Sequence, residues 1–366
     1  MKVRDITRLL EEWAPPFLQE SYDNSGLIVG SLDATITKVL VSLDCTEEVV
    51  KEAEREGAGL IVSHHPIVFS GLKRLTGANY VERTVLRAIK SGIALYAIHT
   101  NLDNIKSGVN FELATALGCL PESLKILRPK ADLLDKVTVY CPEDHLEKVK
   151  EAMFSVGAGS IGNYDNCSFS SSGESTFRPN QYASPFVGEI GEKYSGSEAK
   201  IEVLVERWKT GNVISAASQV HPYEEMAYFI TPISNKEKNI GAGMIGKLAE
   251  PIEWQTFLEN TKSALNVTHL KHTYPPKEKV RTIAVCGGSG AFLLRDAISK
   301  NADVFVTSDF KYHEFFDAEN KILIADVGHY ESEWRTSNLI VSRINHKFTN
   351  FAVRLATTNT NPVQIR

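Results

Sequence analysis

The stretch Leu60-Ile61-Val62-Ser63-His64-His65-Pro66 places two adjacent histidines directly after a short apolar run. Branched apolar residues in a run of this length predict a buried β-strand. Pro66 ends the strand, because proline donates no backbone hydrogen bond and restricts the residue before it. Side chains alternate between the two faces of a strand, so His64 and His65 can converge only where the strand ends. Neutral imidazole is the commonest protein ligand for transition metals, so the stretch indicates a metal site.

Two further apolar runs lead into residues that bind metals. Residues 93–98 are followed by His99-Thr100-Asn101-Leu102-Asp103, and residues 322–327 by Gly328-His329-Tyr330-Glu331-Ser332-Glu333. Open α/β sheets bind ligands at the carboxyl ends of their strands. His329 and Glu333 are four residues apart, which puts both on one face of a helix. Each segment alone could be an ordinary turn or exposed helix, but the three together predict a dinuclear metal site.

The ligand types limit the metal. Imidazole and carboxylate without thiolate suit Zn²⁺, which we expect first, or Mn²⁺, Fe²⁺, Co²⁺ or Ni²⁺. Five side chains are too many for one catalytic zinc and too few to close two structural sites. Two divalent ions per subunit, sharing one bridging carboxylate and one water, fit the count. The expected metal ligands are His64, His65, Asp103, His329 and Glu333.

His99 is open to three interpretations: a ligand, a residue that orients a ligand, or a core residue. We favour the second. A catalytic site also needs a general acid or base beside the metals, and His99 and His313 are the candidates for that role. His313 lies in a segment after another predicted strand, where Asp309, Lys311 and His313 could bind substrate or simply begin a solvated helix.

Two other motifs have both a functional and a structural interpretation. Cys286-Gly287-Gly288-Ser289-Gly290 could bind an anion at a helix N-terminus or form a tight turn. It lacks the pattern of a P-loop or a dinucleotide-binding turn, so those roles are disfavoured. His221-Pro222-Tyr223-Glu224-Glu225 is more typical of a structural turn or a subunit contact than of a metal site.

Composition excludes several classes of protein. A chain of 366 residues predicts two domains. A formal charge of −5 makes nucleic acid an improbable partner. Five cysteines without a CxxC motif suit a reducing compartment. The N-terminus has no apolar signal core, and no run reaches the about 18 apolar residues of a membrane span. We therefore expect a soluble, cytoplasmic protein.

The order of predicted elements divides the chain. Strands and helices alternate at both ends, which predicts an α/β core with a mostly parallel sheet. The middle predicts the order β-α-β-β-α-β of a ferredoxin-like unit, with a turn at Ser172-Gly173-Glu174. All expected ligands lie outside that middle. Residues 1–127 and 237–366 therefore form one discontinuous metal-binding core, and residues 128–236 are an inserted α+β domain.

The set of motifs resembles the Nif-three-like (YbgI/YqfO) family over nearly the whole chain. Besides the three ligand segments, it contains Tyr22-Asp23-Asn24-Ser25-Gly26-Leu27 and Gly287-Gly288-Ser289-Gly290. The insertion is similar to that of the longer members, which resembles PII and CutA proteins. The resemblance implies the five ligands named above, with Glu333 bridging, and a ring-shaped hexamer. One departure is Tyr22, where the family usually has Trp.

The function that follows has two versions. The first is a metal-dependent hydrolase that acts on a small-molecule or nucleotide-like substrate, since the family is often labelled GTP cyclohydrolase I type 2 homologue. The second is a metal-binding scaffold or regulatory protein whose PII-like module senses a ligand without turnover. A general acid or base beside the metals favours the first version.

Overall fold

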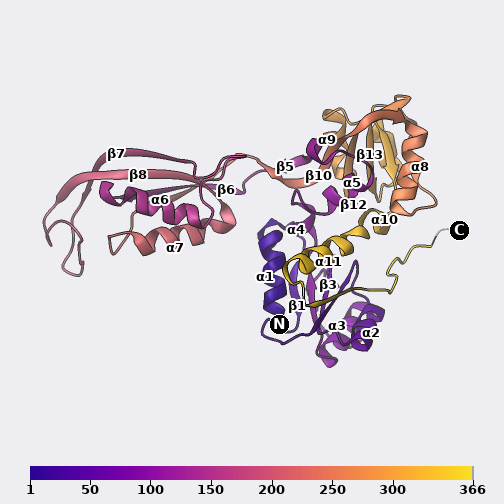
Figure 1. Cartoon of the computed structure of the whole chain (residues 1–366), viewed down its shortest axis with the longest axis horizontal. Helices are drawn as coiled ribbons and strands as arrows, with labels where there is room; N and C mark the ends of the chain where they lie inside the picture. Colours follow the sequence, from indigo (N-terminus) through magenta and orange to yellow (C-terminus); the bar gives the residue numbers. More distant parts are fainter. Residues whose placement is uncertain (365–366) are drawn as a thin grey trace. The chain divides into compact units, whose positions relative to one another are not determined.

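The computed structural model, which describes residues 1–364, divides into two compact units. Unit 1 contains Met1–Pro129 and the chain from Asn239 onward, and unit 2 contains Lys130–Lys238. The indigo N-terminal part and the yellow C-terminal part of the chain thus belong to the same unit (Figure 1). The fold is mixed α/β with several sheets, which confirms the predicted class.

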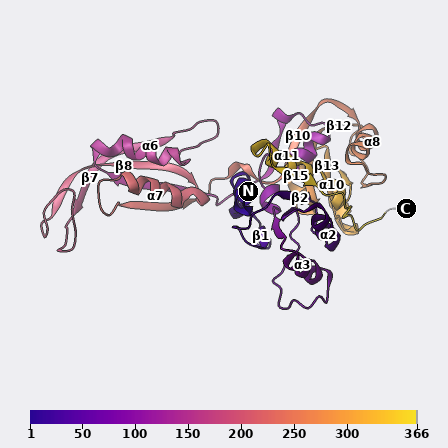
Figure 2. The same cartoon turned by 60° about the horizontal axis from the view of Figure 1, so that its bottom comes forward.

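The first sheet of unit 1 has five strands in the order β1-β4-β3-β2-β15. Strands β15, β2, β3 and β4 are parallel, and β1 runs antiparallel to β4. On one face, Val49 of α2 and Val85 of α3 pack against Ile61, and the two helices contact each other (Figure 2). Helix α11 contacts β2, β15 and α1. The bounds are α1 Val3–Trp13, β1 Gly26–Val29, β2 Lys38–Ser42, α2 Glu47–Glu56, β3 Leu60–Ser63, α3 Tyr80–Lys90, β4 Ala94–Ala97, α11 Arg335–Lys347 and β15 Ala352–Leu355.

The second sheet of unit 1 has six strands in the order β11-β14-β13-β12-β10-β5. Strands β12, β13 and β14 are parallel to one another, while β10 runs antiparallel to β12 and β11 antiparallel to β14. Leu113 of α5 and Phe257 of α8 share one apolar cluster, and Leu294 of α9 belongs to another. The bounds are α5 Val109–Ala116, β5 Lys125–Lys130, β10 Glu237–Glu253, α8 Trp254–Leu265, β11 Lys271–His272, β12 Lys279–Ser289, α9 Leu294–Ser299, β13 Val304–Ser308 and β14 Leu323–Asp326.

The expectation of one mostly parallel sheet is therefore wrong in detail. The predicted strands divide between two mixed sheets, because hydrophobic pattern identifies a buried strand but not the strand that it pairs with. Short helices follow the strand ends that carry the expected ligands. These helices are α4 Thr100–Asp103 and α10 His329–Glu333. Unit 1 also has short 3₁₀ helices at Pro16–Leu18, Pro121–Ser123, Ala291–Leu293 and Tyr312–Ala318.

Unit 2 has the element order β-α-β-β-α-β and one antiparallel sheet, β7-β8-β6-β9. Helices α6 and α7 lie side by side on one face of this sheet (Figure 1). The apolar core shared by the helices and the sheet includes Val137, Val149 and Val203. The bounds are β6 Leu134–Cys141, α6 Leu146–Ser155, β7 Ser168–Phe177, β8 Tyr194–Glu206, α7 Thr210–Val220 and β9 Tyr228–Ile233, with short helices at Glu143–His145 and Arg207–Lys209.

The turn predicted at Ser172-Gly173-Glu174 is wrong. These residues continue β7, which pairs with β8 without interruption from Ser168 to Phe177. Regular cross-strand hydrogen bonding overrides the local turn preference of Ser and Gly, which is a weak one.

His221 is structural, as its sequence context indicated. Its Nε2 donates to the Tyr140 carbonyl at 2.9 Å, and its Nδ1 accepts from the Tyr223 amide at 3.1 Å. Both ring nitrogens are thus used inside unit 2. Within residues 1–364, no helix has the length and apolar character needed to cross a membrane.

Candidate metal centre

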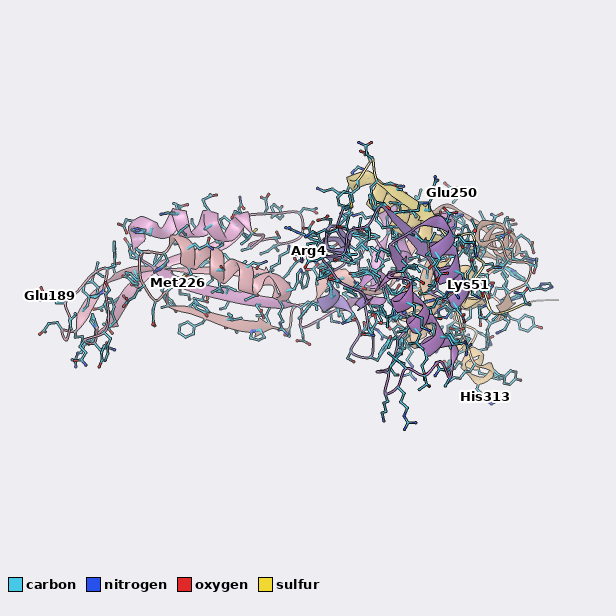
Figure 3. The ribbon with its side chains drawn as sticks, turned by 90° about the horizontal axis from the view of Figure 1, so that it is seen from below. Arg4, Lys51, Glu189, Met226, Glu250 and His313 are labelled. Carbon is cyan, nitrogen blue, oxygen red and sulfur yellow. The ribbon has the colours of Figure 1, made fainter. Side chains whose placement is uncertain are left out.

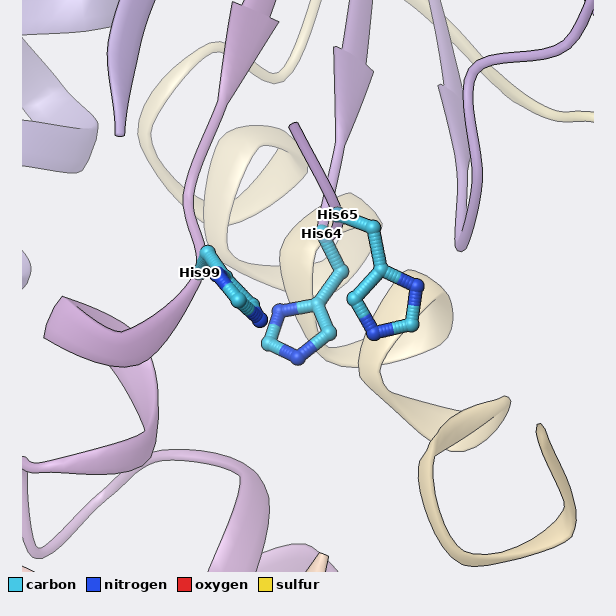
Figure 4. A group of neighbouring side chains, drawn as sticks. All are labelled: His64, His65 and His99. Carbon is cyan, nitrogen blue, oxygen red and sulfur yellow. The ribbon is translucent and has the colours of Figure 1, made fainter. Parts of the chain in front are cut away.

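The predicted ligands meet between strand ends of the two sheets of unit 1. His64 and His65 follow β3, and His99 follows β4 one residue later (Figure 4). Asp103 ends α4, while His329 and Glu333 begin and end α10, which follows β14 of the other sheet. Their ligand atoms form three groups, each within 4.8 Å: His64, Asp103 and Glu333; His65, His329 and Glu333; and His64, His65 and His99.

The group of His64, Asp103 and Glu333 contains buried polar atoms that lack a partner. Nε2 of His64 lies 3.6 Å from Asp103 Oδ1 and 3.9 Å from Glu333 Oε1. Among the described residues, neither His64 Nε2 nor Asp103 Oδ1 has a hydrogen-bond partner. Leaving a buried polar atom unsatisfied costs about 1–3 kcal/mol. These distances are too long for hydrogen bonds. They leave three ligand atoms, from His64, Asp103 and Glu333, close to one another, so this group fits a cation.

The group of His65, His329 and Glu333 uses the other oxygen of the same carboxylate. Oε2 of Glu333 lies 3.0 Å from His65 Nε2 and 3.1 Å from His329 Nε2. The two Nε2 atoms are 3.4 Å apart. Glu333 itself is buried, with 3% of its surface exposed. One carboxylate therefore serves two neighbouring sets of donors, one with each oxygen.

The opposite nitrogen of each imidazole is engaged by an acceptor. A Nδ1–H that donates to an oxygen leaves the lone pair on Nε2, which is how metal-binding histidines are usually oriented. Here each Nε2 of the three predicted histidine ligands faces the cluster. The Nδ1 contacts are His64 to the Ile98 carbonyl (2.8 Å), His65 to Asp44 (2.7 Å), His329 to Asp309 (2.6 Å) and His99 to Asp23 (2.7 Å).

The pKa shifts show how strongly the charges of the cluster depend on one another. Burial opposes charge on His65, but hydrogen bonds with Asp44 and Glu333 raise its pKa to about 10. Burial also opposes charge on His329, but its contacts with Glu333 and Asp309 raise its pKa to about 9. Burial and the charge of Glu333 raise the pKa of Asp103. The cluster thus holds protons that a divalent cation would have to displace.

Asp23 holds His99 and is a residue that the sequence analysis placed only in a family motif. Its carboxylate accepts from His99 Nδ1, from the Thr100 amide at 3.0 Å and from Ser25 Oγ at 3.0 Å. Burial opposes ionisation, but the hydrogen bonds from His99 and from the Thr100 hydroxyl hold the Asp23 pKa well below its usual range. The ring of His99 meets those of His64 and His65 edge-on, with centroids 5.3 Å away in both cases. His99 is therefore fixed beside the predicted ligands.

The sequence analysis missed Asp44 and assigned Asp309 a different role. Asp44 follows β2 at the same sheet edge as His65, and Asp309 follows β13 beside β14. Asp309 contacts His329 rather than standing free for a substrate. An acidic residue just past a predicted strand was the available signal in both cases, but such residues also begin ordinary turns.

The glycine-rich end of β12 packs against Glu333. The Gly287 amide donates to Asn110 Oδ1 and the Gly288 amide donates to Ser332 Oγ, each at 2.9 Å. A Cβ on Gly288 would lie 2.5 Å from Glu333 Oε1, and its φ of +61° is in the left-handed region. The Gly287 and Gly288 amides are used inside the protein, which disfavours the anion-binding interpretation. The tight-turn interpretation is wrong, because residues 286–289 continue β12, with a register shift before Ser289.

His313 lies apart from the cluster. It is exposed on the surface of unit 1 (Figure 3). Its ring stacks on Phe316 with centroids 6.4 Å apart. None of the ligand groups formed by residues 1–364 includes it. Of the two predicted acid–base candidates, only His99 adjoins the predicted ligands.

Comparison with known proteins identifies the family of the chain. The family model described as Duf34/NIF3 (NGG1p interacting factor 3) matches residues 1–362. A Halalkalibacterium halodurans protein named GTP cyclohydrolase 1 type 2 homolog is 38% identical over 326 residues, 88% of this chain and 87% of the relative. A Bacillus subtilis protein of the same name is 35% identical over 98% of this chain and 97% of its own.

A solved structure extends the likeness to the fold. The crystal structure of a Bacillus cereus protein related to NIF3 aligns with a TM-score of 0.86 and 35% identity, covering 100% of this chain and 99% of that one. The family model spans both segments of unit 1. The chain belongs to the Duf34/NIF3 family.

Proposed function

We propose that the protein is a dinuclear metal-dependent hydrolase that acts on a nucleotide-like substrate. The observation that carries the proposal is Glu333, whose two oxygens face separate sets of ligand atoms. His64 and Asp103 would hold one ion, and His65 and His329 the other. Two bound divalent ions, zinc in the first instance, lower the pKa of a bound water and polarise a substrate oxygen.

His99 supplies the proton transfer in this proposal. Asp23 accepts from its Nδ1 at 2.7 Å, which leaves the Nε2 lone pair free to accept a proton. General acid–base groups of this kind contribute about 10²–10⁴-fold to rate. Because Asp23 contacts His99 and not the reacting atoms, it acts as a positioning residue.

Two exposed aromatic rings support a ring-containing substrate. Tyr22 and Phe69 are 63% and 50% exposed, and their centroids are 6.2 Å apart. The ring of Phe69 also lies 6.2 Å from that of His99. Asn24 donates to the Val68 carbonyl at 2.6 Å and so holds the two segments together. Aromatic faces stack well on nucleobases, and the relatives are named as homologues of a GTP cyclohydrolase.

A substrate screen tests this proposal. Zinc- and manganese-loaded protein is incubated with nucleoside triphosphates, including GTP, and with simple phosphoesters, beside Glu333→Gln as the control. We expect metal-dependent turnover of a nucleotide that the variant lacks. Absence of turnover across the panel, with both metals bound, would contradict the hydrolase and favour a metal-binding scaffold.

A second prediction separates the two histidines. His99→Ala should lower turnover by about 10²–10⁴-fold without changing the metal content, because it removes the proposed proton acceptor. His313→Ala should leave both unchanged, since its ring contacts only Tyr312 and Phe316 among the ring contacts described. Steady-state kinetics and elemental analysis of both variants check this. Equal losses of turnover in the two variants would contradict the assignment.

Unit 2 favours a regulatory role as the alternative. We propose that it is an inserted ferredoxin-like module of the PII and CutA kind that senses a ligand. Its compactness, its β-α-β-β-α-β order and the position of every predicted ligand in unit 1 support this. If the protein is a scaffold, this module would report ligand binding and no turnover would occur.

Deletion of residues 128–236 tests the modular organisation. With a short Gly/Ser linker in their place, the remaining chain should fold and bind as much metal per chain as the full protein. Circular dichroism and elemental analysis measure the two properties. An insoluble or metal-free product would show that unit 1 depends on unit 2.

The proposed assembly is a ring-shaped homohexamer. The family resemblance supports it, and closed symmetric oligomers are common among proteins of this kind. Light scattering at micromolar concentration should give about six times the 40.5 kDa chain mass. A monomer at that concentration would contradict the prediction.

A further inference from the structure

The segment Thr357-Thr358-Asn359-Thr360-Asn361, here called the threonine segment, follows β15 and reaches a residue that orients a predicted ligand. Oγ1 of Thr360 donates to Asp44 Oδ2 at 2.6 Å. The other oxygen of Asp44 accepts from His65 Nδ1 at 2.7 Å. Asp44 therefore connects Thr360 to His65, with one oxygen for each.

Glu52 of α2 anchors the beginning of this segment. It is only 4% exposed, and its carboxylate accepts four hydrogen bonds from two consecutive threonines. The amides of Thr357 and Thr358 donate at 2.7 and 2.8 Å, and their hydroxyls donate at 2.9 and 2.5 Å. A buried carboxylate needs such partners to remain charged. The threonine segment is thus held in one position, and Thr360 is brought to Asp44.

The end of the segment contacts the helix that carries two other predicted ligands. Nδ2 of Asn361 donates to Glu331 Oε1 at 2.8 Å. Glu331 lies on α10 between His329 and Glu333. The hydrogen bonds described for the threonine segment lead to His65 and α10, and none of those within residues 1–364 involves His64 or Asp103. Of the two ligand groups that contain Glu333, the segment therefore acts on the one with His65 and His329.

We propose that Thr360 and Asn361 are positioning residues for the ion held by His65, His329 and Glu333, an inference that rests on the proposed dinuclear site. Thr360 fixes the carboxylate plane of Asp44, and Asp44 in turn fixes the His65 ring. Changes to such outer partners typically weaken metal binding by about 10–100-fold. Because coupling is reciprocal, an ion in this group also stabilises the threonine segment.

The test uses the full chain with Thr360→Val and Asn361→Ala combined. The matched control is Thr349→Val, which makes the same chemical change at an exposed threonine with no side-chain hydrogen bond among the described residues. Zinc affinity is measured by competition with a chelator, and the ligand field by the visible absorption of Co²⁺. We expect one of two ions to bind at least about tenfold more weakly in the double variant, with the other unchanged. Thr360→Ser keeps the hydroxyl. When it replaces Thr360→Val in the double variant with Asn361→Ala, it should recover most of the lost zinc affinity.

Hydrogen exchange supplies a second measurement. The amides of Thr357 and Thr358 should exchange more slowly in zinc-loaded than in metal-free wild-type protein. The inference would be overturned if the double variant bound zinc as tightly as Thr349→Val, or if it lost both ions equally. Either result would leave the proposed function standing. Wild-type protein that binds no zinc would overturn the proposed function, and this inference with it.

Discussion

Glu333→Gln should lose both metal ions together. The substitution keeps the shape of the side chain but removes the charge that faces both ligand groups, at 3.9 Å from His64 and 3.0 Å from His65. Without the Glu333 carboxylate, each ion would keep only two protein ligands, fewer than the usual four positions. We expect the affinity of both sites to fall by more than the about 100-fold effect of an outer partner. Elemental analysis after dialysis measures the loss.

Asp103→Asn is the matched control for this prediction. It makes the same change from carboxylate to amide, but Asp103 belongs to only one ligand group. About one ion per chain should therefore remain, held by His65, His329 and Glu333. If Glu333→Gln keeps the wild-type metal content, or if both variants lose one ion, Glu333 does not bridge.

Gly288→Ala should remove metal binding although residue 288 is not itself a ligand. The added Cβ would lie 2.5 Å from Glu333 Oε1 and 3.2 Å from His329 Cε1, so it displaces the carboxylate or the end of β12. The positive φ destabilises the folded protein by about 1–2 kcal/mol when the residue is not glycine. The steric overlap destabilises it by about 1–3 kcal/mol more. Thermal unfolding and metal content together report both effects.

Gly57→Ala separates the two contributions. Gly57 has a φ of +69°, close to that of Gly288, but a Cβ added there would meet no atom within 4 Å. The variant should lose about 1–2 kcal/mol of stability and keep both ions. Equal metal loss in the two glycine variants would mean that backbone strain, not contact with Glu333, is responsible.

That the predicted ligands lie close together could be predicted from sequence, because each of the three segments follows an apolar strand. The runs before His64, His99 and His329 are fully buried in the structure. Carboxyl ends of parallel strands lie at one edge of a sheet, so residues just beyond them have few places to go. The His329 and Glu333 spacing was equally informative, because α10 does begin and end at these two residues.

The rest depended on contacts that the sequence does not contain. The division into two sheets follows from strand pairing, and the orienting roles of Asp23, Asp44 and Asp309 follow from it in turn. His313 resembled His99 in the sequence, since both follow buried strands, but it is exposed in the 3₁₀ helix Tyr312–Ala318. Only the fold shows which histidine adjoins the ligands.

The central claim is a pair of ions per chain, and the metal content of the wild-type protein tests it most directly. Protein loaded with zinc and dialysed against metal-free buffer is analysed for zinc and for amino acids in the same sample. We predict about two zinc ions per chain, in accordance with two ligand groups that share one carboxylate. A ratio of one or none would contradict the dinuclear centre.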